Sequence, residues 1–378
     1  MSQLLAPSEQ GVDASSPFAS APFIVIWEVT RACALACVHC RAEAIPHRDP
    51  EELTTEEGER LIDRIAEFGP RRPLFVLTGG DPMRRRDVAR LVAHGTARGL
   101  SVGLTPSGTA AVTRARLEEV RDAGLARLAI SLDGATAEAH DAFRRVRGSH
   151  GYTMRIVEDA RSLGLPLQIN TTVSRETLAD LPAIAERVEA AGAVLWALFV
   201  LIPVGRARTE QALTAAEIED VLEWAADLQA RAPFGIKTTE APHYQRVVWQ
   251  REHHDDGPIE RAPAIARRKQ LRAPRAVGDG NGFVFVDHIG NICPSGFLPA
   301  ARGNVRSTSL AQVYRNDDMF VRLRDADALM GKCGRCEFRH LCGGSRARAY
   351  AATGAVMAAD PLCAYEPGSG VALPIIQA

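Results

Sequence analysis

The feature of this 378-residue chain that most constrains its fold is an alternation of short apolar segments with amphipathic stretches of helical period. We expect strands in the apolar segments 23–29, 74–82, 101–108, 125–134, 165–173 and 193–203. We expect helices at 55–68, 88–98, 113–123, 152–163, 180–191 and 215–229. Six βα units predict an α/β fold in which helices cover a parallel sheet. A curved sheet of this kind places its active site at the carboxyl ends of its strands.

Three cysteines follow the first apolar segment. Cys33, Cys37 and Cys40 are separated by three and then by two residues. Three thiolates in one short loop can hold a cubane iron-sulfur cluster and leave one iron open to a ligand that is not from the protein. Substrate chemistry can begin at such an iron. A structural zinc knuckle made of the same cysteines and His39 is the alternative that the residues leave open.

Five more cysteines lie toward the C-terminus. Cys333, Cys336 and Cys342 form a CxxCxxxxxC run, and Cys363 can supply a fourth thiolate that would close a metal site completely. The spacing suits either zinc or an iron-sulfur cluster. Cys293 has no partner in this run. It is an inert buried thiol, a hydrogen-atom donor that faces the substrate, or an exchangeable cluster ligand.

Composition and charge exclude several classes of protein. The formal net charge of -1 gives no long-range attraction to nucleic acid or to anionic lipid. No apolar run reaches the length of a membrane-spanning helix, and the N-terminal residues lack the basic start and apolar core of a signal peptide. We therefore expect a cytoplasmic protein with no nucleic-acid partner and no membrane partner. In that compartment cysteines serve metal binding or reactivity rather than disulfides.

The cysteine loop and the βα pattern resemble the radical SAM enzymes, whose signature is a CxxxCxxC loop after the first barrel strand. The resemblance covers about 22–363. It implies a partial (β/α)6 barrel followed by a small C-terminal iron-sulfur domain of the SPASM or twitch type. The domains expected are a flexible tail at 1–21, the barrel at 22–235, a bridging or substrate segment at 236–281 and the SPASM/twitch-like domain at 282–378. The last should begin with a hairpin that turns at 288–291.

The resemblance also implies a cofactor site. Cys33, Cys37 and Cys40 would hold a 4Fe-4S cluster whose open iron chelates S-adenosylmethionine (SAM), and reductive cleavage of SAM would give a 5′-deoxyadenosyl radical. The GGDP segment resembles the family's GGEP motif, which binds the amino group of SAM, with Asp in place of Glu. The remaining contacts would come from successive strand ends, although each of these residues alone could simply cap a helix. The expected cofactor-binding residues are Gly79, Gly80, Asp81, Pro82, Thr105, Ser107, Ser131, Asp133, Arg144, Asn170, Thr172 and Leu201.

The second cysteine set resembles the SPASM extension. Cys333, Cys336, Cys342 and Cys363 match the four that hold one auxiliary 4Fe-4S cluster. Arg346 stands where the run would continue with another cysteine, so the resemblance implies a single auxiliary cluster.

One charged segment, 237–254, lies between the two expected domains, where a substrate pocket would form. Lys237, Glu240, His243, Tyr244 and Arg246 bring together an acid, a base and cations in this segment, and Glu240, His243 and Tyr244 are the candidate catalytic groups, together with Cys293. A solvated face is the alternative interpretation of such a charged run.

The segment WEVTRACALACVHCRA is most similar to radical SAM enzymes that modify haem and haem-like cofactors. We therefore expect a radical SAM enzyme that abstracts hydrogen from a small non-peptidic metabolite (a sugar, a nucleoside or a tetrapyrrole). Decarboxylation, oxidation or epimerisation would follow, with a flavodoxin or ferredoxin as electron donor. The alternatives are a maturase of a ribosomally made peptide and a non-catalytic iron-sulfur or zinc protein that transfers electrons or acts as a scaffold.

Overall fold

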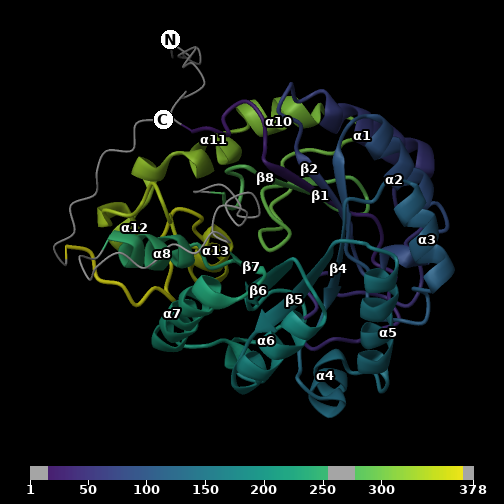
Figure 1. The fold of residues 1–378 in the computed structure, drawn as a ribbon. Helices are drawn as coiled ribbons and strands as arrows, with labels where there is room; N and C mark the ends of the chain where they lie inside the picture. Colours follow the sequence, from purple (N-terminus) through teal and green to yellow (C-terminus); the bar gives the residue numbers. More distant parts are fainter. Residues whose placement is uncertain (1–15, 254–276, 369–378) are drawn as a thin grey trace, which may run out of the picture.

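The computed structural model describes residues 16–253 and 277–368 (Figure 1). Its centre is a nine-stranded sheet of order β7-β6-β5-β4-β3-β2-β1-β8-β9, in which every neighbouring pair is parallel except the antiparallel pair β8 and β9. The strands are β1 (Ile24–Glu28), β2 (Leu74–Thr78), β3 (Ser101–Leu104), β4 (Arg127–Ser131), β5 (Leu167–Val173), β6 (Leu195–Val200), β7 (Gly235–Thr239), β8 (Phe283–Val286) and β9 (Ile292–Cys293). The predicted α/β partial barrel is confirmed, and the six predicted strands are all present.

Helices cover the outer face of this sheet (Figure 1). They are α1 (Thr55–Ala66), α2 (Val88–Ala97), α3 (Arg114–Asp122), α4 (Ala137–Arg144), α5 (Ser149–Ser162), α6 (Leu181–Ala190) and α7 (Ala215–Arg231). The segments after β7 add α8 (His243–His253), α10 (Leu310–Asn316), α11 (Asp318–Arg324), α12 (Gly331–Arg335) and α13 (Arg346–Thr353). Local sequence sets where several begin. Thr54 and Glu57 form a capping box at α1, and Thr214 and Glu217 form another at α7. Within the described ranges, no helix is long and apolar enough to cross a membrane.

Side chains along each strand point alternately to the core beneath the helices and to the interior of the barrel. In β1, Val25 and Trp27 are fully buried beneath the helices. Gly58 of α1 lies so close to Trp27 that a Cβ atom there would be 2.4 Å from the indole ring. Ile24 and Ile26, which alternate with these two residues, point the other way and line the interior of the barrel. The concave face of the sheet therefore remains available for a binding site.

Two features near the expected domain boundaries were not foreseen from the sequence. Residues 16–21 of the expected tail are packed on the fold, because Phe18 is buried and its carbonyl accepts a 2.6 Å hydrogen bond from the Tyr314 hydroxyl. The hairpin of β8 and β9 forms as predicted, but β8 pairs in parallel with β1 and so extends the barrel sheet.

The expected bridging segment also contains regular structure. Its first part forms the end of β7 and α8, while the stretch 254–276 lies outside the described residues. Helices α8, α12 and α13 gather on the side of the molecule opposite α1 to α3 (Figure 1). The described residues of this segment therefore connect the end of the barrel sheet with the cysteine-rich C-terminal part.

Candidate active site

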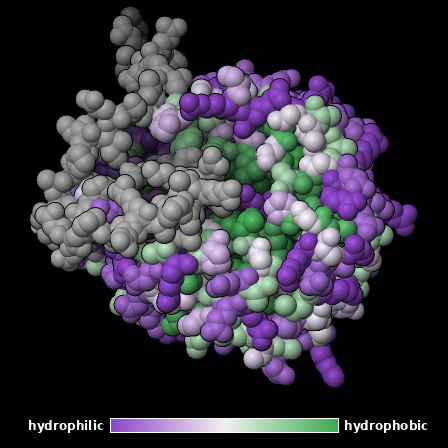
Figure 2. Space-filling view, in the orientation of Figure 1, coloured by the Kyte–Doolittle hydropathy of each residue, from purple (hydrophilic) through white to green (hydrophobic). Residues whose placement is uncertain are grey.

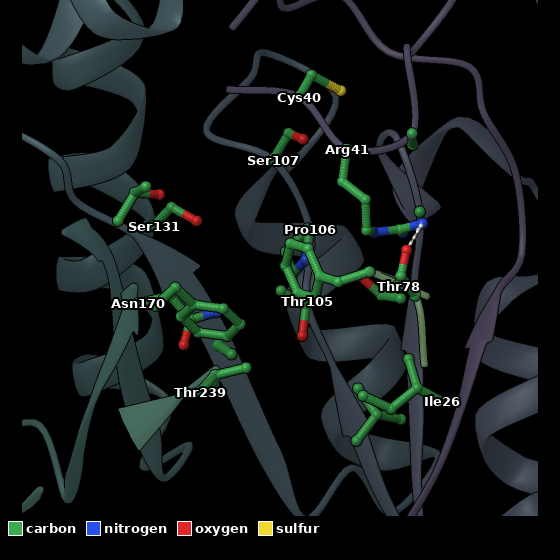
Figure 3. Close-up of a pocket in the computed structure, with 18 of the residues that line it drawn as sticks. Ile26, Cys40, Arg41, Thr78, Thr105, Pro106, Ser107, Ser131, Asn170 and Thr239 are labelled. Carbon is green, nitrogen blue, oxygen red and sulfur yellow. Dashed lines mark hydrogen bonds between the residues drawn. The ribbon is translucent and has the colours of Figure 1, made fainter. Parts of the chain in front are cut away.

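A cavity of about 390 Å³ occupies the concave side of the sheet. Figure 2 shows apolar residues gathered in the hollow of this face, with hydrophilic side chains around its edge. Alternate residues of the strands form its wall, and in Figure 3 Cys40 lies toward one end of the space while Ile26 and Thr239 lie toward the other. The cavity is thus a lumen that continues from the strand ends deep into the barrel.

The loop after β1 places its three cysteines at the carboxyl-end side of the lumen. Cys33, Cys37 and Cys40 all line the cavity. Backbone N–H groups point at two of the sulfurs, from Leu35 to Cys33 Sγ at 3.3 Å and from Ala44 to Cys40 Sγ at 3.4 Å. N–H donors of this kind stabilise thiolates, so the loop fits a thiolate-bound cluster.

Burial raises the pKa of the Cys33 and Cys37 thiols. Bound iron offsets this cost, because coordination deprotonates a thiol. Among the residues with described positions, no three Cys, His, Asp or Glu side chains meet as the ligands of a single metal ion. His39 stacks on Phe143, with the ring centroids 4.4 Å apart.

The GGDP segment packs directly on the cysteine loop. Gly80 N–H donates to the Thr30 carbonyl at 2.8 Å, and a Cβ atom on Gly80 would lie 2.5 Å from the Arg31 carbonyl oxygen. Gly79 and Gly80 line the cavity. Asp81 lies behind them, where its carboxylate accepts hydrogen bonds from Thr109 Oγ1 at 2.7 Å and from the Met83 N–H at 3.1 Å. The structure thus gives Asp81 a role in shaping the loop, next to Pro82, which begins a short 3-10 helix.

Asp133 and Arg144 form a buried ion pair at the wall of the lumen. Asp133 also accepts a 2.6 Å hydrogen bond from the Thr172 N–H, and Arg144 Nη1 lies 3.6 Å from Cys37 Sγ. Burial opposes ionisation of Asp133, but the charge of Arg144, together with His39, His140 and the Thr172 N–H, outweighs it and holds the pKa of Asp133 below its usual value. Arg144 therefore connects the end of β4 to the cysteine loop.

Most of the other expected cofactor-binding residues reach the cavity. Its wall includes Thr105, Ser107, Ser131, Asn170, Thr172 and Leu201, each at or beyond the carboxyl half of its strand. Ser107 is fixed by a 2.6 Å hydrogen bond from its hydroxyl to the Gly80 carbonyl, and Asn170 accepts one of 2.7 Å from Gln168. The structure therefore brings these residues together around one space. Asp81, Pro82 and Asp133 stand behind that wall rather than in it.

The lumen carries an excess of positive charge. Its wall includes Arg41, Arg127, Arg144, Arg206 and Lys237, whereas Glu240 is its one Asp or Glu among the residues described. Arg41 is paired with Glu28 at 2.7 Å, and Arg144 is paired with Asp133. Arg206 has its Nε and Nη2 atoms buried without a hydrogen-bond partner in the described parts of the chain. Such a site suits an anionic molecule with a large apolar surface.

The surroundings of Glu240 favour its protonated form. Burial raises its pKa well above the usual value, and the negative charge of Asp279 acts in the same direction. Ser345 donates a 2.6 Å hydrogen bond to Glu240 Oε2, and the backbone at Glu240 has a φ of 60°. A non-glycine residue in this region is strained, and such strain collects at functional sites. Glu240 therefore stands in the lumen wall with its carboxyl group bonded to Ser345 and Asp279.

The second cysteine set surrounds a separate small cavity. Cys333, Cys336, Cys342 and Cys363 all line it. The Gly344 N–H donates to Cys342 Sγ at 3.4 Å, and the Asp360 N–H donates to Cys333 Sγ at 3.4 Å.

Around these cysteines the chain leaves room and supplies positive charge. Gly344 has a φ of +67°, and a Cβ atom there would lie 3.2 Å from Cys333 Sγ, so glycine is required at this point. Arg246, Lys332 and Arg339 also line the cavity. Four thiols with nearby N–H donors and cations fit a closed anionic cluster.

The remaining candidate catalytic residues are dispersed. His243 lines the second cavity, where its Nε2 atom lies 3.2 Å from the Asp360 carboxylate. Tyr244 belongs to the hydrophobic core, and its hydroxyl donates to the Ala225 carbonyl at 3.4 Å. Cys293 is buried in β9 and lines neither of these cavities, and burial raises its pKa to about 12. Of the four candidates, Glu240 is the one in the lumen.

Three cations of the lumen, Arg41, Arg127 and Arg206, were not selected as site residues from the sequence. Arg127 begins β4 and Arg206 follows β6, while Lys237 was noted only as part of a charged segment. For two of these cations the sequence did indicate a position in the lumen. Arg127 and Lys237 occupy inward positions of strands whose neighbours are mostly apolar, and a charged residue there must face a polar space.

Comparisons with known proteins agree with this geometry. Residues 27–188 match the model of the radical SAM superfamily. The AdoMet-dependent heme synthase of Oleidesulfovibrio alaskensis is 40% identical over 91% of this chain and 87% of its own length, and that of Methanosarcina barkeri is 38% identical over 92% and 98%. Among solved structures, Streptococcus suis SuiB bound to S-adenosylmethionine has a TM-score of 0.69 at 13% identity and covers 92% of this chain and 78% of its own.

Proposed function

Because the chain belongs to the radical SAM superfamily, and within it to the family of the AdoMet-dependent heme synthases, we propose that its substrate is a haem precursor with carboxylate side chains. The chain is a radical SAM enzyme that uses a 4Fe-4S cluster and SAM and acts on a small molecule. The proposal adds the class of that molecule and the outcome. We infer that a hydrogen atom is removed from the carbon beside the one that bears a carboxylate, that carbon dioxide then leaves as a carbon–carbon double bond forms, and that the one remaining electron would pass to an acceptor such as the auxiliary cluster.

The observation that carries this proposal is the charge and surface of the lumen. Phe199, Phe283, Phe285 and Phe297 line it together with aliphatic side chains, and its cations outnumber its acids. A tetrapyrrole has a flat apolar body and acidic side chains, so it matches both properties. A neutral sugar would leave the cations of the lumen without partners, and a nucleoside would do the same.

The groups that would hold the cofactors follow from the geometry. Cys33, Cys37 and Cys40 would hold the cluster that binds SAM, and this group supplies the 5′-deoxyadenosyl radical that removes hydrogen from carbon. Gly79 and Gly80 let the chain approach that cofactor closely, because neither has a side chain. The apolar wall of the barrel excludes water, which protects a carbon radical from side reactions.

The second cysteine set and Glu240 complete the proposed machinery. Cys333, Cys336, Cys342 and Cys363 would hold one auxiliary cluster, fully ligated by the protein. Glu240, at the lumen wall, would adjoin an acidic group of the substrate without repelling it, since burial and Asp279 raise its pKa and so favour its neutral form. His243, beside the second cysteine set, would act on Asp360 rather than on the substrate.

The cellular compartment and the electron donor are also part of the proposal. We place the enzyme in the cytoplasm, where thiols stay reduced and the clusters can persist. Its electron donor would be a small flavodoxin or ferredoxin.

The test is a turnover assay with the anaerobically reconstituted enzyme. Iron coproporphyrin III, SAM and dithionite are mixed, and both 5′-deoxyadenosine and the porphyrin mass are followed. We expect 5′-deoxyadenosine to form in step with a porphyrin that has lost carboxyl groups as carbon dioxide. Formation of 5′-deoxyadenosine without any change in the porphyrin, together with turnover of a peptide substrate, would reject the proposed substrate class.

A further inference from the structure

Two cations lie deep in the lumen, away from the carboxyl ends of their strands. Arg127 is the first residue of β4, at the end of the strand opposite the cysteine loop. Lys237 is the middle residue of β7, and both side chains line the cavity. β5 and β6 separate these two strands in the sheet, so the two side chains reach the lumen from different parts of its curved wall.

Neither cation has a counter-ion within the described residues. No hydrogen bond or ion pair joins Lys237 to any described side chain, and the Arg127 Nε atom is buried without a hydrogen-bond partner. Arg41 and Arg144, in contrast, each contact a carboxylate. The two deep cations, like Arg206 beyond β6, are thus paired with no acid among the described residues of the lumen, where Glu240 is bonded to Ser345 instead.

Burying unpaired cations is costly, and a fold retains them where another molecule supplies the missing charge. Burial lowers the pKa of Lys237 to about 8, with the charge of Arg127 acting in the same direction, and burial alone lowers the pKa of Arg127. A structural role would require a partner within the protein. The remaining explanation is an anion that enters with the ligand.

We propose that Lys237 and Arg127 form a carboxylate-binding subsite deep in the lumen, which holds one acidic side chain of the substrate. This inference rests on the proposed function, since it assumes a substrate with carboxylates. The subsite would pull one acidic arm of the substrate through the lumen and past the strand ends. The carbons of that arm would then lie between the deep cations and the cysteine loop, which is where a radical formed at that loop could reach them.

Lys237 and Arg127 are therefore positioning residues that select which arm of the substrate reacts. The ammonium group of Lys237 is a point charge on a flexible stem, whereas the Arg127 guanidinium can bind a carboxylate through two N–H groups. Removing either charge should weaken binding of an acidic ligand and leave binding of its neutral ester unchanged.

The experiment measures binding rather than turnover. The reconstituted holoenzyme is titrated anaerobically with iron coproporphyrin III and, separately, with its tetramethyl ester, and the absorbance change of the porphyrin gives Kd. The variants are Lys237→Met, Lys237→Arg and Arg127→Gln. Arg121→Gln, on the exposed surface of α3, is the matched control for loss of one positive charge.

We expect Lys237→Met and Arg127→Gln each to raise Kd for the acid at least about tenfold, while Kd for the ester stays within twofold. Lys237→Arg should restore most of the affinity, and Arg121→Gln should change neither value. Iron content and circular dichroism identify a variant that fails to fold, and the other deep cation then provides the test. Equal affinity of wild type and both charge-removing variants for the acid overturns the subsite, whereas failure of the wild type to bind the porphyrin at all rejects the proposed function instead.

Discussion

Arg144 contacts both the Asp133 carboxylate and the Cys37 sulfur, so one buried guanidinium joins the end of β4 to the cysteine loop. The same Asp133 accepts the Thr172 N–H from β5. The position of Cys37 therefore depends on two strands of the barrel as well as on its own loop.

Asp133→Asn should damage the loop through Arg144, because it leaves a buried guanidinium without its charged partner. Breaking a buried pair in this way costs about 3 to 5 kcal/mol of unfolding free energy. Urea denaturation of the anaerobic protein measures the loss, and the iron content should fall with it. Asp122→Asn, at the exposed end of α3, is the control, and an equal effect there would contradict a specific role of the pair.

Gly80→Ala should abolish SAM cleavage in a folded protein. Its Cβ atom would lie 2.5 Å from the Arg31 carbonyl oxygen and 2.6 Å from that of Ala32, so the cysteine loop must move. The measurement is 5′-deoxyadenosine formation after dithionite reduction. Gly151→Ala in α5 meets no atom within 4 Å and should retain cleavage, with a stability gain of about 0.5 to 1 kcal/mol. Normal cleavage by Gly80→Ala would show that this close approach is dispensable.

Glu240→Gln should stabilise the protein at neutral pH. The pKa of Glu240 is raised in the folded state, so its contribution to stability is fully present below the unfolded value near 4.5 and is lost as pH rises toward the folded pKa. Glutamine resembles the protonated carboxyl group and does not ionise, so the variant loses no stability over that pH range. Urea unfolding at pH 5 and at pH 7.5 should show a difference between variant and wild type that grows with pH. A difference that stays constant would mean that Glu240 ionises normally.

The affinity for the substrate should depend on pH through the charge of Lys237. Its pKa is about 8 in the free enzyme, and Arg127 is the charged neighbour that lowers it further after burial. Lys237 therefore loses its charge as pH rises through 8, and affinity for a carboxylate ligand should fall there. The titration with iron coproporphyrin III at pH 7 and at pH 9 measures this. Lys237→Arg stays charged and should show little change, and an identical decline in this variant would assign the effect to another group.

Much of the fold and of the candidate site could be predicted from local sequence. Apolar β-branched strands, capped helices and closely spaced cysteines are short-range signals, and they placed all six predicted strands and both cysteine sets. The pairing of β8 with β1 could not be predicted, because the local sequence of a strand does not reveal which distant strand pairs with it. Asp81 shows the same limit at the site, since only the fold reveals that its carboxylate turns toward Thr109.

The pairing of β1 with β8 also bears on how the protein is made. β1 and its cysteine loop leave the ribosome early, but one edge of β1 stays open until the much later segment 283–286 has been synthesised. Contacts so distant in sequence form slowly, and an open strand edge is exposed to wrong partners in the meantime. The cysteine loop therefore reaches its final setting only near the end of synthesis, which favours loading of its iron after translation and makes a separately expressed barrel prone to aggregate.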